Sequence, residues 1–157
     1  MDILDEEIVN LWKCFQKNSF EYIMVGGFAT NLHGFSRTTA DMDIWLKDTL
    51  ENRNKLNQSL IDFGYGPIPS IEKMEFIPGW TTIQLTSGIA LDLMTFLKGF
   101  PQERFDDCKK YASTATLFDL TIPFLHINHL IEAKKATMRS KDIVDIEELE
   151  KIKKLNQ

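Results

Sequence analysis

Residues 22–46 constrain the fold of this chain more than any other stretch. A short apolar run, YIMV, ends at Gly26 and Gly27, and a second apolar run begins with Asp41 and Asp43. If the second run is a strand, successive side chains point to opposite faces, so the two aspartates share one face. The chain therefore places two carboxylates side by side, a short distance along the sequence from a glycine turn.

Two carboxylates on one strand face need a partner of opposite charge. They repel each other, and neither leaves water easily while its charge is unbalanced. Magnesium prefers hard oxygen ligands and is often held by one or two carboxylates together with substrate phosphates. The pair Asp41 and Asp43 therefore predicts a magnesium site beside a phosphate-binding turn.

Gly26 and Gly27 supply such a turn. Glycine takes backbone conformations closed to other residues and lets a ligand approach the backbone closely. The start of the helix expected after the turn presents N–H groups and a positive dipole end, which attract phosphate. Arg37, in the following loop, either binds a triphosphate through its fork of donors or neutralises the aspartates. Thr39 is expected to bond locally within that loop.

These residues resemble the nucleotidyltransferase superfamily that includes DNA polymerase beta, in its small single-domain bacterial form. The pattern of that superfamily is a Gly-Gly or Gly-Ser turn at a helix start, then Asp-x-Asp on a strand, then a third carboxylate on a neighbouring strand. Gly26-Gly27 and residues 41–43 match the first two parts, and Asp92 fits the third. Many members carry serine where Gly27 stands.

The resemblance continues towards the end of the chain. The spacing of the first motif looks like that of small uncharacterised and AbiEii-like toxin-type members. Lys134, followed by Arg139-Ser140-Lys141-Asp142 and then Asp145, is similar to the Lys, Arg-x-Lys-Asp, Asp signature of the same group. The likeness therefore covers nearly the whole chain and implies a single nucleotidyltransferase-like domain over residues 1–157.

The resemblance implies a transferase that moves a nucleoside monophosphate from an NTP, such as ATP, to an acceptor hydroxyl and releases pyrophosphate. Asp41, Asp43 and Asp92 are the expected catalytic residues and ligands of two Mg²⁺ ions, with Mn²⁺ as the alternative metal. The residues expected to bind the nucleotide are Gly26, Gly27, Arg37, Thr39, Lys134 and Lys141. Three acceptors remain open, namely an RNA 3′ end, a hydroxyl on a partner protein and a small molecule such as an aminoglycoside.

A function of another class is also compatible with these motifs. A non-catalytic module, as one half of a toxin–antitoxin-like pair, would keep the fold and bind nucleotide or a partner protein without turnover. The presence of Asp41, Asp43 and Asp92 counts against this alternative. Magnesium-dependent nucleotide binding separates the two hypotheses.

Several conspicuous side chains have simpler explanations. His33 ends a helix and is expected to bond a backbone group, and Trp45 is expected in the core although it shares the face of the aspartates. His126 and His129 have no third metal ligand near them in the sequence and are expected to be capping or surface groups. Lys134 falls on the apolar side of its helix, so it either extends to the surface or reaches into the cleft.

The composition limits the classes of function. A chain of 157 residues with 43% hydrophobic residues is enough for one core. A net charge of −5 and a pI near 5.2 argue against a broad nucleic-acid-binding surface. Cys14 and Cys108 lie far apart and indicate neither a disulfide framework nor a zinc site. No apolar run has the length of a membrane span and the first residues are acidic, so we expect a cytoplasmic location without membrane contact.

The periodicity predicts an α/β (α+β) fold, with helices packed against a mixed sheet and a helical pair at the C-terminus. Helices are expected at 3–17, 26–32, 50–63, 99–112 and 127–138, with a last helix capped by Ser140 and striped with Ile143, Ile146, Leu149, Ile152 and Leu155. Strands are expected at 20–25, 41–46, 81–86, 89–96, 115–120 and 121–125. Pro123 predicts a sheet edge. The segment 70–80 is expected to border the cleft and to select the substrate.

Overall fold

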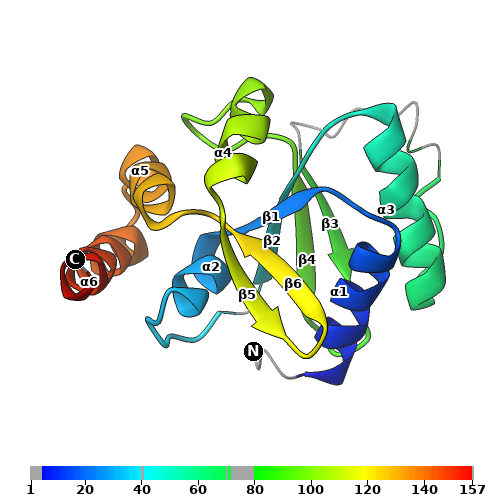
Figure 1. Cartoon of the computed structure of the whole chain (residues 1–157), viewed down its shortest axis with the longest axis horizontal. Helices are drawn as coiled ribbons and strands as arrows, with labels where there is room; N and C mark the ends of the chain where they lie inside the picture. The colour runs from blue at the N-terminus through cyan, green and yellow to red at the C-terminus, as the bar shows by residue number, and fades with distance from the viewer. Residues whose placement is uncertain (1–4, 40, 70, 72–79, 157) are drawn as a thin grey trace.

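The computed structural model describes residues 5–39, 41–69, 71 and 80–156. These residues form a six-stranded mixed sheet with helices on both sides (Figure 1). The helices are α1 (Glu6–Lys17), α2 (Gly26–Leu32), α3 (Leu50–Phe63), a 3-10 turn (Gln102–Arg104), α4 (Phe105–Tyr111), α5 (Ile127–Thr137) and α6 (Ser140–Leu155). The strands are β1 (Tyr22–Val25), β2 (Asp41–Leu46), β3 (Trp80–Gln84), β4 (Ala90–Met94), β5 (Ser113–Leu117) and β6 (Leu120–Phe124). None of the described helices is both long and apolar enough to cross a membrane.

The strand order is β3-β4-β2-β1-β6-β5, and its register places the acidic residues together. Strand β2 runs parallel to β4 and antiparallel to β1, with Asp43 opposite Asp92 on one side and opposite Val25 on the other. Because directly opposite residues lie on the same face of a sheet, both aspartates point to one side. The predicted strand at 41–46 is confirmed. The predicted hairpin of 81–86 with 89–96 is also confirmed, although its two strands, β3 and β4, are shorter than expected.

Aromatic side chains fill the core on both faces of the sheet. On the face opposite the aspartates, Tyr22 of β1 packs against Phe15 of α1 with ring centroids 5.1 Å apart. On the face of the aspartates, Trp45 is fully buried against Phe100 and Phe105 and donates its indole N–H to the Thr95 carbonyl at 2.8 Å. The expectation that Trp45 serves the core is therefore confirmed.

The hairpin that contains Pro123 differs in one respect from the prediction. Strand β5 forms the edge of the sheet, whereas β6, which carries Pro123, lies one strand inside, between β5 and β1. The parallel pairing with β1 is confined to Phe124 opposite Met24. Pro123 therefore precedes that pairing, and an inner strand tolerates it.

The C-terminal helical pair is present, but its details correct the prediction. Arg139, not Ser140, is the N-cap of α6. Ile143 and Leu155 of the predicted apolar stripe are 46% and 84% exposed. Leu149 of that stripe is buried as predicted and Ile146 packs partly buried against the core, but the other buried residues of α6 are Asp142 and Asp145. Met138, the last residue of the helix predicted at 127–138, is exposed at the αL junction between α5 and α6. Helix α6 therefore turns a largely acidic face towards the fold. Most of the segment 70–80 lies outside the described residues.

Asn52 of α3 ties the start of β1 to the end of β2, which makes it a test of the fold. Its buried amide accepts from Glu21 N at 2.8 Å and donates to the carbonyls of Glu21 and Lys47 at 2.9 and 2.7 Å. We expect Asn52→Ala to lower the free energy of unfolding by about 2–3 kcal/mol, because it leaves buried backbone groups without partners. Urea denaturation measures the change. Asn54→Ala, on the exposed side of the same helix, is the control, and an equal loss in both variants would contradict this role.

Candidate active site

Two carboxylates from neighbouring parallel strands meet at the centre of the site. Asp92 is 6% exposed and accepts a hydrogen bond at 2.7 Å from the hydroxyl of Thr82, its cross-strand partner on β3. Asp43, opposite it on β2, is half-buried and in hydrogen-bonding contact with the Asp92 carboxyl. Asp41 lies exposed at the start of β2. The strand pairing thus places Asp43 opposite Asp92, while Asp41 lies two residues along β2 on the same face, opposite Ala90.

The electrostatics of the cluster are unfavourable without a counter-charge. Burial raises the pKa of Asp43 to about 7, and the neighbouring carboxyls of Asp92 and Asp41 raise it in the same direction. The charge of Lys141, at the start of α6, acts in the opposite direction. Near neutral pH, Asp43 therefore exchanges its proton readily for another cation.

The donor set fits a hard divalent metal ion. Carboxylate oxygens are the ligands that magnesium prefers, and a dication relieves the repulsion that holds the Asp43 pKa high. In the described part of the chain no three acidic, histidine or cysteine side chains already form a metal-ligand cluster. The residues that would hold magnesium are Asp43 and Asp92, joined by the exposed Asp41.

The glycine turn after β1 touches both the acidic cluster and the following loop. Gly26 has φ +66°, and a Cβ there would overlap Oδ2 of Asp43. A Cβ at Gly27 would lie 2.6 Å from Nη2 of Arg37 and 3.0 Å from Oγ1 of Thr39. The space that a serine side chain would need at position 27 is therefore taken by the guanidinium. Only glycine at both positions allows this close approach of backbone, carboxylate and arginine.

A cavity of about 370 Å³ opens beside this turn. Its lining includes Gly26 and Asp43 together with the cationic residues Lys98, Lys134 and Arg139. Its other walls are mostly apolar and consist of Val25, Met94, Phe96, Leu97, Leu125, Leu130 and Ala133, with Thr137 beside them. The cavity therefore combines one carboxylate of the acidic cluster, Asp43, with cations and an apolar surface, which suits a ligand with both phosphates and a flat ring.

The other predicted nucleotide-binding residues do not all line the cavity. Lys134 is 5% exposed and lines the cavity, but its amine also donates to Asp145 at 2.8 Å. Arg37 lies behind the glycine turn and is likewise bonded to Asp145. Thr39 donates to the carbonyl of Asp41 at 3.2 Å, as expected of a loop residue, and Lys141 is exposed. Their roles in nucleotide binding stay predictions.

Sequence reasoning assigned no function to Thr82, Arg139 or Asp145. Thr82 is found by register, because the hairpin that carries Asp92 places it directly opposite. Arg139 belongs to the C-terminal signature without a role of its own, yet it lines the cavity. Asp145 belongs to the C-terminal signature, but nothing in the sequence indicates that it contacts a residue more than a hundred positions away.

His33 and His126 have structural roles, as expected. The Nε2 atom of His33 lies 2.8 Å from the Leu125 carbonyl, and its ring packs edge-on against Phe124. His126 caps α5 by accepting the N–H of Asn128.

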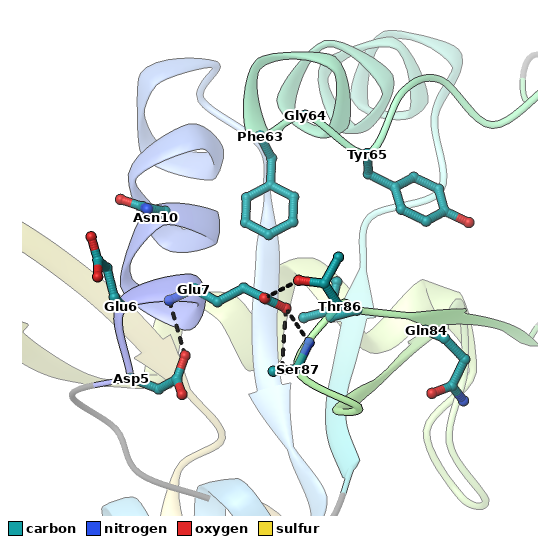
Figure 2. Close-up of a pocket in the computed structure, with 11 residues that line it drawn as sticks. Asp5, Glu6, Glu7, Asn10, Phe63, Gly64, Tyr65, Gln84, Thr86 and Ser87 are labelled. Carbon is teal, nitrogen blue, oxygen red and sulfur yellow. Dashed lines mark hydrogen bonds between the residues drawn. The ribbon is translucent and has the colours of Figure 1, made fainter.

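A second and larger cavity, of about 510 Å³, lies between the start of α1, the end of α3 and the β3–β4 turn (Figure 2). Its acidic residue Glu7 already accepts hydrogen bonds from Thr86 and Ser87. The lining includes none of the three aspartates and no glycine of the β1–α2 turn. The smaller cavity is therefore the candidate active site, because it alone of these two joins the turn to the acidic cluster.

Comparison with known proteins is informative at the level of structure. No protein-family model and no curated protein matches the sequence. The chain is similar to the crystal structure of the lincosamide antibiotic adenylyltransferase LnuA with lincomycin bound, with a TM-score of 0.65 and 18% identity over 97% of this chain and 99% of that one. It is also similar to an antigenic nucleotidyltransferase-like protein from Paracoccidioides brasiliensis, with a TM-score of 0.52 and 15% identity over 91% of this chain and 74% of that one. The predicted nucleotidyltransferase fold is thereby confirmed.

The contact between Gly26 and Asp43 predicts an unequal effect of two glycine substitutions. Gly88→Ala introduces a Cβ at φ +90° in open space and should cost about 1 kcal/mol of backbone strain. Gly26→Ala adds a clash with the carboxylate and should cost at least about 1 kcal/mol more. Thermal unfolding with and without magnesium measures both. If both variants lose the same stability, or if magnesium stabilises Gly26→Ala as much as the wild type, the contact between Gly26 and Asp43 is unimportant.

The raised pKa of Asp43 predicts a pH dependence of stability. Its pKa of about 7 in the folded chain exceeds the ordinary value of 3.8, so the folded state holds more protons between these values and this contribution to stability falls as pH rises through the window. Between pH 5 and 8 without metal, we expect Asp43 to contribute a loss on the order of 2 kcal/mol, whereas burial, which lowers the pKa of His33 and His129, acts in the opposite direction. Asp142, with its pKa lowered to about 2, contributes only below this range.

Urea denaturation in EDTA at both pH values gives the measurement. Asp43→Asn should remove this part of the pH dependence, and magnesium at pH 8 should stabilise the wild type but not the variant. A wild-type stability that rises between pH 5 and 8, with the same slope in Asp43→Asn, would contradict the assignment.

Proposed function

We propose that this chain is a divalent-metal-dependent nucleotidyltransferase, which moves a nucleoside monophosphate from an NTP to an acceptor hydroxyl and releases pyrophosphate. One observation carries the proposal. Asp43 and Asp92 lie opposite each other on β2 and β4, and Asp43 shares a cavity with Gly26 at the start of α2. The nucleotidyltransferase fold of the chain supports the same reaction class.

Residues of the cavity and of the acidic cluster can take separate roles in an in-line displacement. An oxygen of the acceptor hydroxyl forms a bond to the α-phosphorus, the bond from that phosphorus to the bridging oxygen of pyrophosphate breaks, and the hydroxyl proton passes to a carboxylate, for which Asp92 is placed. Bound magnesium would supply charge neutralisation at the phosphates and acidify the hydroxyl. Asp41, Asp43 and Asp92 would hold it, and Gly26, Gly27, Arg37, Thr39, Lys134 and Lys141 would bind the triphosphate.

Among the three acceptors, we propose a small hydroxylated molecule, with ATP as the donor. The similarity to LnuA, which acts as an adenylyltransferase on a lincosamide antibiotic, extends over almost the full length of both chains. The negative net charge of −5 also disfavours a polyanionic RNA acceptor. An RNA end or a partner protein then becomes an outcome that the experiment can reveal.

The AbiEii-like grouping, the toxin–antitoxin setting with a partner protein, and the cytoplasmic location stay predictions from the sequence. The same holds for the use of Mn²⁺ in place of Mg²⁺. The non-catalytic module differs from the proposed enzyme in one measurable property, because it binds nucleotide or partner without transfer. It is therefore a defined outcome of the assay below.

Transfer of label from α-³²P-ATP tests the proposal. The purified chain is incubated with Mg²⁺ and, separately, with lincomycin, an aminoglycoside panel, total RNA and cell-lysate protein. We expect labelled product with a small molecule, and a loss of about 10³-fold in rate for Asp43→Asn and Asp92→Asn, which remove charge from the metal site.

Asp107→Asn removes an exposed carboxylate on α4 and serves as the matched control, with expected wild-type activity. Nucleotide binding that is equal in wild type and Asp43→Asn, without transfer to any acceptor, would replace the enzyme with the binding module. Labelling of RNA or protein alone would overturn the proposed acceptor class and keep the reaction class.

A further inference from the structure

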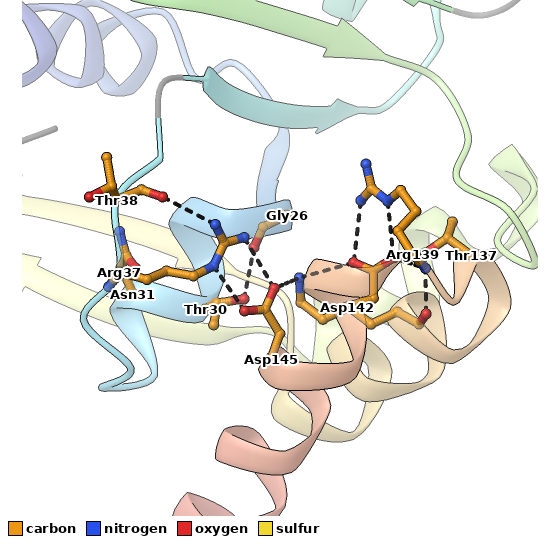
Figure 3. A network of polar contacts seen from close by, with 10 residues as sticks. Gly26, Thr30, Asn31, Arg37, Thr38, Thr137, Arg139, Asp142 and Asp145 are labelled. Atoms are coloured by element: carbon orange, nitrogen blue, oxygen red, sulfur yellow. Dashed lines mark hydrogen bonds and ion pairs between the residues drawn. The ribbon is translucent and has the colours of Figure 1, made fainter.

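One buried carboxylate, Asp145 of α6, contacts two cations that come from separate parts of the chain (Figure 3). Its Oδ2 atom accepts from Nζ of Lys134 at 2.8 Å and from Nη2 of Arg37 at 3.1 Å. A second contact, from Arg37 Nε to Oδ1 at 2.9 Å, is an ion pair without hydrogen-bond geometry. The Asp145 side chain is 1% exposed, so it acts on a ligand only through the cations that it contacts.

The charges around Asp145 do not cancel. Asp142, the neighbouring buried carboxylate, accepts from Arg139 at 3.0 Å and from Thr137 at 2.6 Å. Its closest oxygen to Lys134 Nζ is 3.9 Å away, beyond hydrogen-bonding distance. The network of Figure 3 therefore sets three cations, Arg37, Lys134 and Arg139, against two carboxylates, and one positive charge remains.

The surplus charge lies next to the candidate active site. Lys134 lines the cavity that also contains Gly26 and Asp43, and Arg37 reaches to 2.6 Å from the place of a Cβ at Gly27. An ammonium group has three donors, of which Lys134 gives one to Asp145. Arg37 likewise gives only part of its five N–H groups to Asp145 and the Thr38 carbonyl. Both cations thus keep donors for a further anion.

We propose that Asp145 is a positioning residue, which holds Lys134 and Arg37 as a preset pair for the polyphosphate chain of the substrate. The inference rests on the proposed function, because a nucleoside triphosphate is what brings that chain into the cavity. Free lysine and arginine side chains lose rotamer entropy when they are fixed in one conformation. Asp145 fixes both side chains when the chain folds, so that the ligand meets them already ordered.

A purely electrostatic role for Asp145 leads to the opposite expectation for one substitution. Asp145→Asn removes a negative charge beside two cations, and charge alone predicts tighter anion binding. Positioning predicts weaker binding, because the amide no longer orders Lys134 and Arg37. The sign of the change in affinity therefore distinguishes the two roles.

The experiment measures binding of inorganic tripolyphosphate with Mg²⁺ by calorimetry and, separately, KM and kcat for ATP. We expect Asp145→Asn to weaken tripolyphosphate binding about tenfold and to raise KM by a similar factor with a smaller change in kcat. Mn²⁺ binding without phosphate, which depends on Asp43 and Asp92, should stay unchanged. Glu150→Gln, an equal loss of charge on the outer side of α6, is the matched control and should leave all values near wild type.

Asp145→Glu covers the case in which the amide variant does not fold. It keeps the charge but moves the carboxylate by one methylene, so tripolyphosphate affinity should fall while the charge of the network stays the same. Unchanged or tighter binding in either folded variant, or wild-type protein that does not bind tripolyphosphate, would overturn the positioning role. If the wild-type protein transfers no nucleotide, but Asp145→Asn binds tripolyphosphate more weakly than the wild type, the proposed function fails and the positioning role stands.

Discussion

The contact between Asp43 and Asp92 is the constraint on which the rest of the site depends. Their separation is set by the parallel pairing of β2 with β4, so the two carboxylates cannot move apart without a change of register along both strands. Burial and mutual repulsion make this arrangement costly, as the pKa of about 7 at Asp43 shows. A cation bound there would offset this cost, and the sheet topology therefore supports the proposed metal-dependent chemistry.

A second charged centre, with the opposite excess, adjoins the same cavity through Lys134 and Arg139. Helix α6 buries Asp142 and Asp145 and is fastened through them to Arg139, Lys134 and Arg37. The attachment of a helix and the arrangement of cations thus depend on the same carboxylates. Breaking one partner of a buried ion pair leaves the other charge uncompensated. Ligand affinity is therefore needed to distinguish the attachment of α6 from the arrangement of the cations, because stability alone reports on both.

Local sequence rules predicted much of the fold and one half of the site. The period of two placed Asp41 and Asp43 on one face, and the glycine pair located the start of α2. The other half depends on contacts between distant residues, such as Arg37 with Asp145, that no local pattern encodes. The same cause explains the errors at α6, because an apolar stripe was expected where buried ion pairs hold the helix, and Ile143 is exposed as a result.

The two charged centres also bear on what can approach the site. The whole chain has an excess of acidic residues, with 23 Asp and Glu against 18 Lys and Arg, so its average field repels polyanions. The cations near the cavity are local and largely engaged by Asp142 and Asp145. They can attract a compact triphosphate at short range, whereas an extended nucleic acid needs a continuous basic surface. An acceptor that is neutral or cationic meets no such barrier, which favours a small hydroxylated molecule over RNA.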